Sequence, residues 1–277
     1  MASQKNENLL NLALETPEAE REQSLELNVG FNKEEKTWEV IVKYHGTLEA
    51  LAERQIEVEE LIAGYAILTV PESRMEELAQ IEQIEYVEKP KRLFFEDLAV
   101  KEAVCFLPGS GLAESLTGKG VLVAVIDSGI SYWNSDFRHA DGTTRIRFLW
   151  DQITGKEYDA AQINEALATD NREAALGIVP SIDTTGHGTA VAGIAAGNGG
   201  TAGAAYAGMA PESELLVVRL GVPGAEAFPR TTELMRALNY VVQKALLLQM
   251  PVAVNVSFGN TYGAHNGTSL LERFLDN

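Results

Sequence analysis

Hydrophobic positions in the second half of the chain form the pattern of a buried parallel sheet. An unbroken aliphatic run over residues 121–126 ends at Asp127, Ser128 and Gly129. A run without polar positions is typical of a strand that is buried on both faces. The pattern also predicts strands over residues 146–150, 215–220 and 252–257, and a long amphipathic helix over about residues 231–249. Strands that alternate with helices predict an open α/β sheet.

The first hundred residues follow a different pattern. The predicted elements are a strand over 38–44, a helix over 48–56 capped by Thr47, two short strands around Gly64, a helix that starts at Pro71, and a strand over 84–88. This order of strand, helix, two strands, helix and strand is that of a small ferredoxin-like α+β unit. Because many functions use this architecture, it decides none of them alone.

Changes in composition divide the chain into four segments. Residues 1–36 are polar and acidic with a weak helical pattern, which predicts a mobile or loosely docked N-terminal arm. Residues 37–96 hold the ferredoxin-like unit. Residues 97–118 lack periodicity and contain Pro108, Gly109, Gly111 and Gly118, so we predict a linker there. Residues 119–277 hold the α/β domain, with an insertion at 151–182 that is predicted to contain a helix near residues 160–176.

The charge of the chain argues against two classes of partner. The formal net charge is −18, and residues 1–100, with 22 acidic and 10 basic residues, contribute −12 of it. Such a surface repels nucleic-acid phosphates and anionic membranes, so neither is an expected partner. No apolar run is long enough to span a bilayer. The lone Cys105 cannot form an internal disulfide, which fits a reducing compartment.

His187 has the most distinctive neighbourhood of the four histidines. It lies between Gly186 and Gly188, and small residues with helical character follow it. Glycines beside the ring let backbone and substrate come close, and the small residues let a helix pack tightly on a sheet. An imidazole at the start of such a helix suits general-base chemistry, since its ordinary pKa is near neutrality. A histidine in a loop is more often structural, so the interpretation depends on a partner.

Asp127 is the candidate partner, because it ends a buried strand. In parallel sheets, functional residues gather at the carboxyl ends of strands. A buried carboxylate can accept the Nδ1 proton of an imidazole, fix its tautomer and stabilise the imidazolium. The alternative for Asp127 alone is a carboxylate that caps the turn after the strand.

These motifs together resemble those of the subtilisin-like serine proteases. The segment around Asp127 resembles the Asp motif of that family, residues 186–193 resemble its His motif, and residues 255–259 resemble its cleft strand. The order of Asp before His also matches. The resemblance covers about residues 119–260. It implies an open, mostly parallel sheet with helices on both faces, and a catalytic pair of Asp127 and His187.

The resemblance also implies a peptide substrate and an internal inhibitor. Ser257, Phe258 and Gly259 match the strand that binds an extended peptide by backbone pairing in the family. The ferredoxin-like unit at 37–96 resembles the family's propeptide, which inhibits the catalytic domain and places its C-terminal tail in the cleft. More loosely, the whole resembles the clostridial subtilases that include the Csp germination proteases. The expected partners are therefore a protein or peptide substrate and the chain's own propeptide.

The chain departs from the family at two points. Ala190 stands where many members have a second histidine, at a position of packing. More seriously, the motif Gly-Thr-Ser-Met-Ala-x-Pro of the serine nucleophile is absent from the 277 residues. Gly267, Thr268 and Ser269 imitate its start, but the following residues fit the first turn of a surface helix, with Ser269 and Glu272 as a capping box.

Three functions follow as expectations. The first is an N-terminal part of a subtilisin-like serine endopeptidase, inactive as given because it lacks the nucleophile. The alternative is a non-catalytic pseudoprotease that binds or regulates; an unrelated α/β binding module with a chance motif is a third. The chemistry requires no cofactor, although Asp136 is a candidate ligand for structural calcium. Since the first 30 residues show no secretory signal, we expect a cytoplasmic or spore-internal location.

Overall fold

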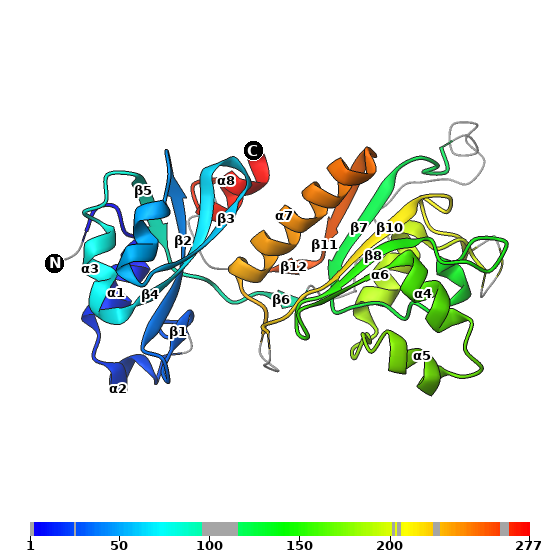
Figure 1. The fold of residues 1–277 in the computed structure, drawn as a ribbon, viewed down its shortest axis with the longest axis horizontal. Coiled ribbons are helices and arrows are strands. Elements are labelled where there is room, and N and C mark those ends of the chain that lie inside the picture. The colour runs from blue at the N-terminus through cyan, green and yellow to red at the C-terminus, as the bar shows by residue number, and fades with distance from the viewer. Residues whose placement is uncertain are drawn as a thin grey trace. The chain divides into compact units, whose positions relative to one another are not determined.

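A computed structural model describes residues 3–24, 26–95, 116–200, 203, 206–223, 228–260 and 266–277 (Figure 1). The predicted linker at 97–118 lies mostly outside these residues. The chain divides into two compact units. The first unit comprises Met1–Leu93, Arg230–Asn239 and Asn260–Asn277, and the second comprises Phe94–Pro229 and Tyr240–Gly259.

The sheet of the first unit is antiparallel and is built around β2. Its strands are β1 (Phe31–Asn32), β2 (Thr37–Tyr44), β3 (Glu57–Leu61), β4 (Tyr65–Pro71) and β5 (Ile84–Glu88). β4 lies between β2 and β3 and pairs with both. β1 pairs with the start of β2, at Thr37 and Trp38, and β5 pairs with its later part, from Ile41 to Tyr44. The order β5-β2-β4-β3 is that of a ferredoxin-like sheet, as predicted.

The helices of the first unit are shorter than predicted. The helix expected over 48–56 is the 3₁₀ helix Glu49–Arg54, and no side chain caps its start. The helix expected from Pro71 is the 3₁₀ turn Glu72–Arg74 followed by α3 (Met75–Leu78). Met75 and Leu78 are buried, as the pattern required. These crossovers are therefore short helical turns, and the packing of a few apolar side chains stabilises them.

The prediction of a mobile or loosely docked arm at 1–36 is wrong. Residues 8–21 form α1 (Asn8–Glu15) and α2 (Glu18–Arg21), and Leu10 and Ala13 are fully buried in the core. The guanidinium of Arg21 lies 4.3 Å from the ring centroid of Phe31 and 4.8 Å from that of Trp38. The polar composition hid this docking, because much of the packing is by a cation on aromatic rings.

The second unit contains the predicted, mostly parallel sheet. Its strands are β7 (Leu122–Asp127), β8 (Ile146–Asp151), β9 (Lys156–Asp159), β10 (Glu214–Arg219) and β11 (Val252–Val256). Their order is β11-β7-β10-β8-β9, with every pair parallel except β8 with β9. The β8–β9 hairpin was not predicted, because β9 has only one buried position, Tyr158.

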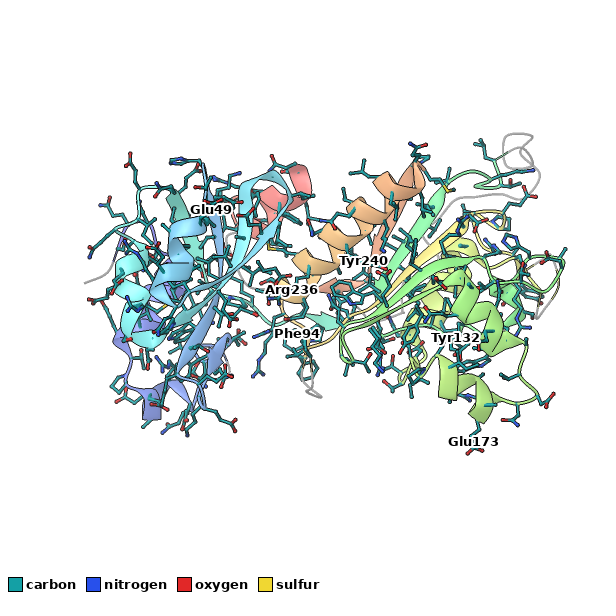
Figure 2. The ribbon with its side chains drawn as sticks, in the orientation of Figure 1. Glu49, Phe94, Tyr132, Glu173, Arg236 and Tyr240 are labelled. Carbon is teal, nitrogen blue, oxygen red and sulfur yellow. The ribbon has the colours of Figure 1, made fainter. Side chains whose placement is uncertain are left out.

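Helices cover both faces of this sheet. Val123 and Val125 of β7 lie in one core cluster with Val191 and Ala192 of α6 (His187–Ala196). On β8, the ring of Trp150 lies 4.8 Å from that of Tyr240 in α7 (Thr231–Leu248), labelled in Figure 2. The single helix expected near 160–176 is two, α4 (Ala160–Leu167) and α5 (Arg172–Ile178). Asn171 separates them, because its side chain caps α5.

Candidate active site

Asp127 lies at the carboxyl end of β7, inside the sheet of the second unit. Every residue of β7 is buried, and Asp127 is 0% exposed. β7 is an internal strand, with β11 on one side and β10 on the other. The chain leaves the sheet after Asp127 through a tight turn. Gly129 makes that turn with a φ of 119°, which residues with a Cβ rarely adopt. The position is therefore the end of a buried parallel strand, as the sequence predicted.

His187 is the first residue of α6 and meets Asp127. Gly186, before it, has a φ of 78° and turns the chain into the helix. The Nδ1 atom of His187 lies 2.8 Å from Oδ1 of Asp127, and the imidazole side chain is 11% exposed. With Nδ1 bound to the carboxylate, Nε2 is the ring atom that can accept a proton from a reacting group. The structure thus brings the two predicted catalytic residues together.

Two residues beside the pair, Ser128 and Asp183, were not predicted to have a role. Ser128 donates its backbone N–H to Oδ1 of Asp127 over 2.7 Å, and its hydroxyl lies 2.8 Å from Oδ1 of Asp183. Asp183 also accepts the backbone N–H groups of Gly186 and Thr189. Burial alone would raise the pKa of Asp183, but hydrogen bonds from Thr189, Ser128 and Gly186 lower it below its ordinary value. An aspartate a few residues before a helix is the sequence signal that could have identified it.

The predicted substrate strand pairs with another part of the chain. β12 (Phe258–Gly259) lies antiparallel to β6 (Phe94–Phe95), with Phe258 opposite Phe95. Val256 at the end of β11 lies opposite Ile126, so the next residue, Ser257, follows at the level of Asp127. An extended segment therefore pairs with the predicted substrate strand, near the contact of Asp127 with His187, in the manner of β-augmentation.

An aromatic contact accompanies this pairing. The ring of Phe94, labelled in Figure 2, lies 5.4 Å from the ring of Phe228. Phe258 is buried, whereas Phe94 is 39% exposed. Aromatic pairs at such distances stabilise a contact beyond the area that they bury. β6 is therefore held by the ring contact of Phe94 with Phe228 in addition to its backbone pairing with β12.

Ser269 has the structural role that the sequence favoured. It precedes α8 (Leu270–Asp276), accepts the backbone N–H of Glu272 and bonds the Glu272 carboxylate over 2.8 Å. Both halves of a capping box are present. The hydroxyl is thus engaged in capping the start of α8.

No metal site emerges from the described residues, where no group of three or more His, Cys, Asp or Glu side chains could hold an ion. The candidate calcium ligand Asp136 lies in the 3₁₀ helix Ser135–Phe137. Its carbonyl oxygen accepts bonds from Asn198 and from Nη1 of Arg145. Calcium binding at Asp136 stays a prediction.

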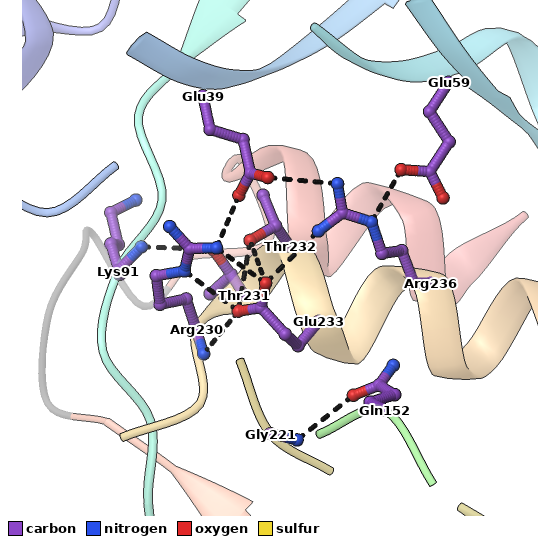
Figure 3. Close-up of polar contacts among 10 residues, drawn as sticks. All are labelled: Glu39, Glu59, Lys91, Gln152, Gly221, Arg230, Thr231, Thr232, Glu233 and Arg236. Atoms are coloured by element: carbon purple, nitrogen blue, oxygen red, sulfur yellow. Dashed lines mark hydrogen bonds and ion pairs between the residues drawn. The ribbon is translucent and has the colours of Figure 1, made fainter. Parts of the chain in front are cut away.

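The first unit contains a cluster of ion pairs, which we call the arginine cluster (Figure 3). Its members are Glu39, Glu59, Arg230, Glu233 and Arg236. Glu39 of β2 lies 2.9 Å from Arg230 and 3.0 Å from Arg236, each through Nη2. Glu59 of β3 lies 2.6 Å from Nε of Arg236. Glu233, only 1% exposed, joins both arginines from within α7.

The arginines hold the central carboxylate ionised. Burial alone would raise the pKa of Glu39, but Arg230 and Arg236 lower it below its ordinary value of 4.5. Further contacts join the same segments: Lys91 donates its backbone N–H to Thr231, and Glu88 accepts the backbone N–H of Leu270. The ferredoxin-like sheet therefore packs by charge on residues 230–239 and 270–276 within one compact unit.

Two family models match separate parts of the chain, and these parts correspond to the two folded segments that the hydrophobic pattern predicted. Residues 4–91 match the Csp protease B prodomain, and residues 118–270 match the subtilase family. A subtilisin of Bacillus sp. (strain TA39) is 26% identical over 152 residues, which cover 55% of this chain and 30% of that protein. In the described residues, no helix has the length and apolar character needed to cross a membrane.

Two solved structures resemble the chain. The CspB protease of Clostridium perfringens matches with a TM-score of 0.54 and 39% identity, over 58% of this chain and 34% of that one. Fervidolysin from Fervidobacterium pennivorans, a keratinolytic enzyme related to subtilisin, has a TM-score of 0.52 at 12% identity, over 89% of this chain and 39% of that one, and shows the fold alone. The chain spans between 30% and 39% of the length of these three relatives.

Proposed function

Because the chain belongs to the subtilase family, we propose that it supplies two members of the catalytic triad of a serine endopeptidase. The observation that carries this proposal is the 2.8 Å contact between Nδ1 of His187 and Oδ1 of a fully buried Asp127. In the proposed reaction, Nε2 of His187 takes the proton of the serine as that serine attacks the peptide carbonyl. Asp127 fixes the tautomer of His187 and stabilises the imidazolium, and His187 then returns the proton to the leaving amine.

We do not assign the serine nucleophile to any residue of this chain. Residues 1–277 lack the family's serine motif, and Ser269 caps α8. We therefore propose that residues 1–277 by themselves do not hydrolyse peptides, since loss of a triad member leaves only residual catalysis. The chemistry needs sequence that carries the serine and an oxyanion donor.

Residues 37–96 are proposed to be an internal inhibitor of this site. Two observations support the proposal. β6, near the end of this segment, pairs with the predicted substrate strand in place of a peptide. The sheet before it packs through the arginine cluster on residues that match the subtilase family. A segment that occupies the cleft strand and is anchored elsewhere competes with substrate at a high effective concentration.

The proposed activity is tested on the natural polypeptide. It is captured from its source cells with an antibody against residues 160–178, so that forms with and without the proposed inhibitor are both recovered, its intact mass is measured, and it is treated with a fluorophosphonate that labels activated serines. We expect a mass above the 30.1 kDa of this chain, labelling of a serine, and loss of labelling in His187→Ala. An unlabelled species of 30.1 kDa would instead favour the pseudoprotease, which binds without catalysis.

The arginine cluster makes the stability of the first unit depend on pH. The pKa of Glu39 is depressed in the folded state, so its stabilisation is complete above its ordinary pKa of 4.5 and disappears as the pH falls through the lower folded value. At pH 7, Glu39→Gln is expected to lower the free energy of unfolding by about 2 kcal/mol, the scale of a hydrogen bond to a charged group. As the pH falls below 4.5, the difference between the variant and the parent should shrink.

Fluorine NMR can measure this difference in the free energy of unfolding for the first unit separately from the second. The three tryptophans are replaced by 5-fluorotryptophan, and urea unfolding is followed at the resonance of Trp38, in the first unit. Glu22→Gln is the control, because Glu22 pairs with an exposed lysine, Lys33, and surface pairs contribute little. A difference for Glu39→Gln that does not begin to shrink as the pH is lowered below 4.5 contradicts the assignment.

A further inference from the structure

The hydroxyl of Ser128 lies between two carboxyl groups and can donate its single proton to only one of them. Its Oγ atom is 2.8 Å from Oδ1 of Asp183 and 3.1 Å from Oδ1 of Asp127. A hydroxyl has one donor and two acceptor sites. The choice of partner decides whether Asp127 shares its charge with Ser128 or reserves it for His187.

The acceptor sites of Ser128 are both in use. Its Oγ atom accepts the backbone N–H of Gly188 over 3.0 Å and the hydroxyl of Thr185 over 2.9 Å. With Thr185 donating to Ser128, its shorter contact, the proton of Ser128 points at one of the two carboxyl groups.

Oδ1 of Asp127 is already occupied. It accepts Nδ1–H of His187 over 2.8 Å and the backbone N–H of Ser128 over 2.7 Å. Two donors fill the two lone-pair directions of one carboxylate oxygen. A third donor on this atom would compete with His187, and the contact of Ser128 with Asp183, at 2.8 Å, is shorter than its 3.1 Å contact with Asp127, so the geometry favours donation to Asp183.

Asp183 is built to remain an anion that accepts this proton. Oδ1 accepts the backbone N–H groups of Gly186 and Thr185 over 2.9 and 3.2 Å, and Oδ2 accepts the N–H and hydroxyl of Thr189 over 2.8 and 2.6 Å. These donors belong to the turn and first helical residues on either side of His187. The same carboxylate therefore fixes the backbone around the imidazole and faces the hydroxyl beside Asp127.

From this arrangement we infer that Asp183 is a positioning residue for the catalytic pair. By accepting the proton of Ser128, Asp183 leaves Oδ1 of Asp127 to the imidazole of His187. This inference rests on the proposed function, because it gives the Asp127–His187 contact a catalytic purpose. The effect of Asp183 on the imidazole therefore runs through the hydroxyl of Ser128.

Asp183→Asn should transfer the proton of Ser128 toward Asp127. An amide has no charge, and its NH₂ group must face either Gly186 N–H or Thr189 N–H, both of which are donors. The neutral amide competes poorly with the carboxylate of Asp127 for the hydroxyl proton. The bond from Nδ1–H of His187 to Asp127 then weakens.

The weakening is measured on the 277-residue chain by NMR, through the Nδ1–H proton of His187. We expect a downfield resonance that disappears in His187→Ala, and in Asp183→Asn an upfield shift of that resonance with faster exchange with water. In Asp183→Asn/Ser128→Ala the resonance should coincide with that of Ser128→Ala alone, since the effect of Asp183 runs through the hydroxyl. Asp141→Asn is the matched control, because Asp141 accepts the N–H and hydroxyl of Thr143 in an exposed loop.

The outcomes separate the two hypotheses. A parent chain without the resonance overturns the catalytic pair, and with it the proposed function. A resonance that Asp183→Asn leaves in place overturns the inference alone. A double variant that keeps the shift of Asp183→Asn also overturns it, because Asp183 then acts only by holding the loop. In the natural polypeptide, we expect Asp183→Asn to lower kcat about 10-fold without changing KM, the lower end of the effect of removing the partners that orient metal-binding histidines.

Discussion

Asp127→Asn in the natural polypeptide will lower kcat for peptide hydrolysis by about 10⁴, the loss found when the aspartate of a serine triad becomes an amide. If the amide turns its oxygen toward His187, its NH₂ group replaces Oδ2, a buried atom without a hydrogen-bond partner among the described residues. If it turns its NH₂ group toward His187, it holds the imidazole in the wrong tautomer. Both orientations are costly, and the second removes the base. Steady-state kinetics on a chromogenic peptide measures the loss.

Asp151→Asn is the matched control for this variant. Asp151 also ends a parallel strand of the same sheet and is 0% exposed, but it pairs with Arg219 at 2.9 Å. Its replacement should reduce stability, because it breaks a buried ion pair, while kcat per folded molecule stays near that of the parent. An Asp127→Asn enzyme that keeps more than about a tenth of the parental kcat contradicts the proposed role.

The sequence predicted the parts of the fold whose residues are uniform in character. The aliphatic run of β7 is buried on both faces, so its pattern needs no knowledge of its neighbours. The capping box of Ser269 and Glu272 is equally local, because both partners lie within one turn. Asp127 and His187 were predicted as a pair because one ends such a strand and the other starts a helix of small residues.

The remaining features depend on contacts between distant residues. Arg21 looks like a solvated charge in the sequence, but in the structure it lies on the rings of Phe31 and Trp38. The role of Asp183 depends on Ser128, which is 55 residues away along the chain. No periodicity records which carboxylate receives the proton of a given hydroxyl. The rings around Arg21 come together only in the packed core, and Ser128 meets Asp183 only in the folded sheet. Neither contact can therefore be predicted from one sequence.

The second large effect is expected at Gly188, where helix α6 touches the turn after β7. A Cβ atom at this position would overlap the carbonyl oxygen of Gly129 and lie 3.1 Å from Cβ and Oδ1 of Asp127. Because backbone is on the other side of the clash, no side chain can rotate to relieve it. Gly188→Ala is therefore expected to lower the free energy of unfolding of the second unit by about 3 kcal/mol, the upper part of the usual cost of overpacking. It should also separate His187 from Asp127.

Gly193→Ala in the same helix is expected to have the opposite sign. Nothing lies within 4 Å of a Cβ atom built at Gly193, which is inside α6. Alanine there should raise the free energy of unfolding by about 0.5–1 kcal/mol, because glycine is the more flexible residue in the unfolded chain. Both variants are unfolded in urea and followed at the 5-fluorotryptophan resonances of Trp133 and Trp150, in the second unit. If Gly188→Ala is as stable as Gly193→Ala, helix propensity alone governs the site, and α6 does not approach the turn as closely as the catalytic contact requires.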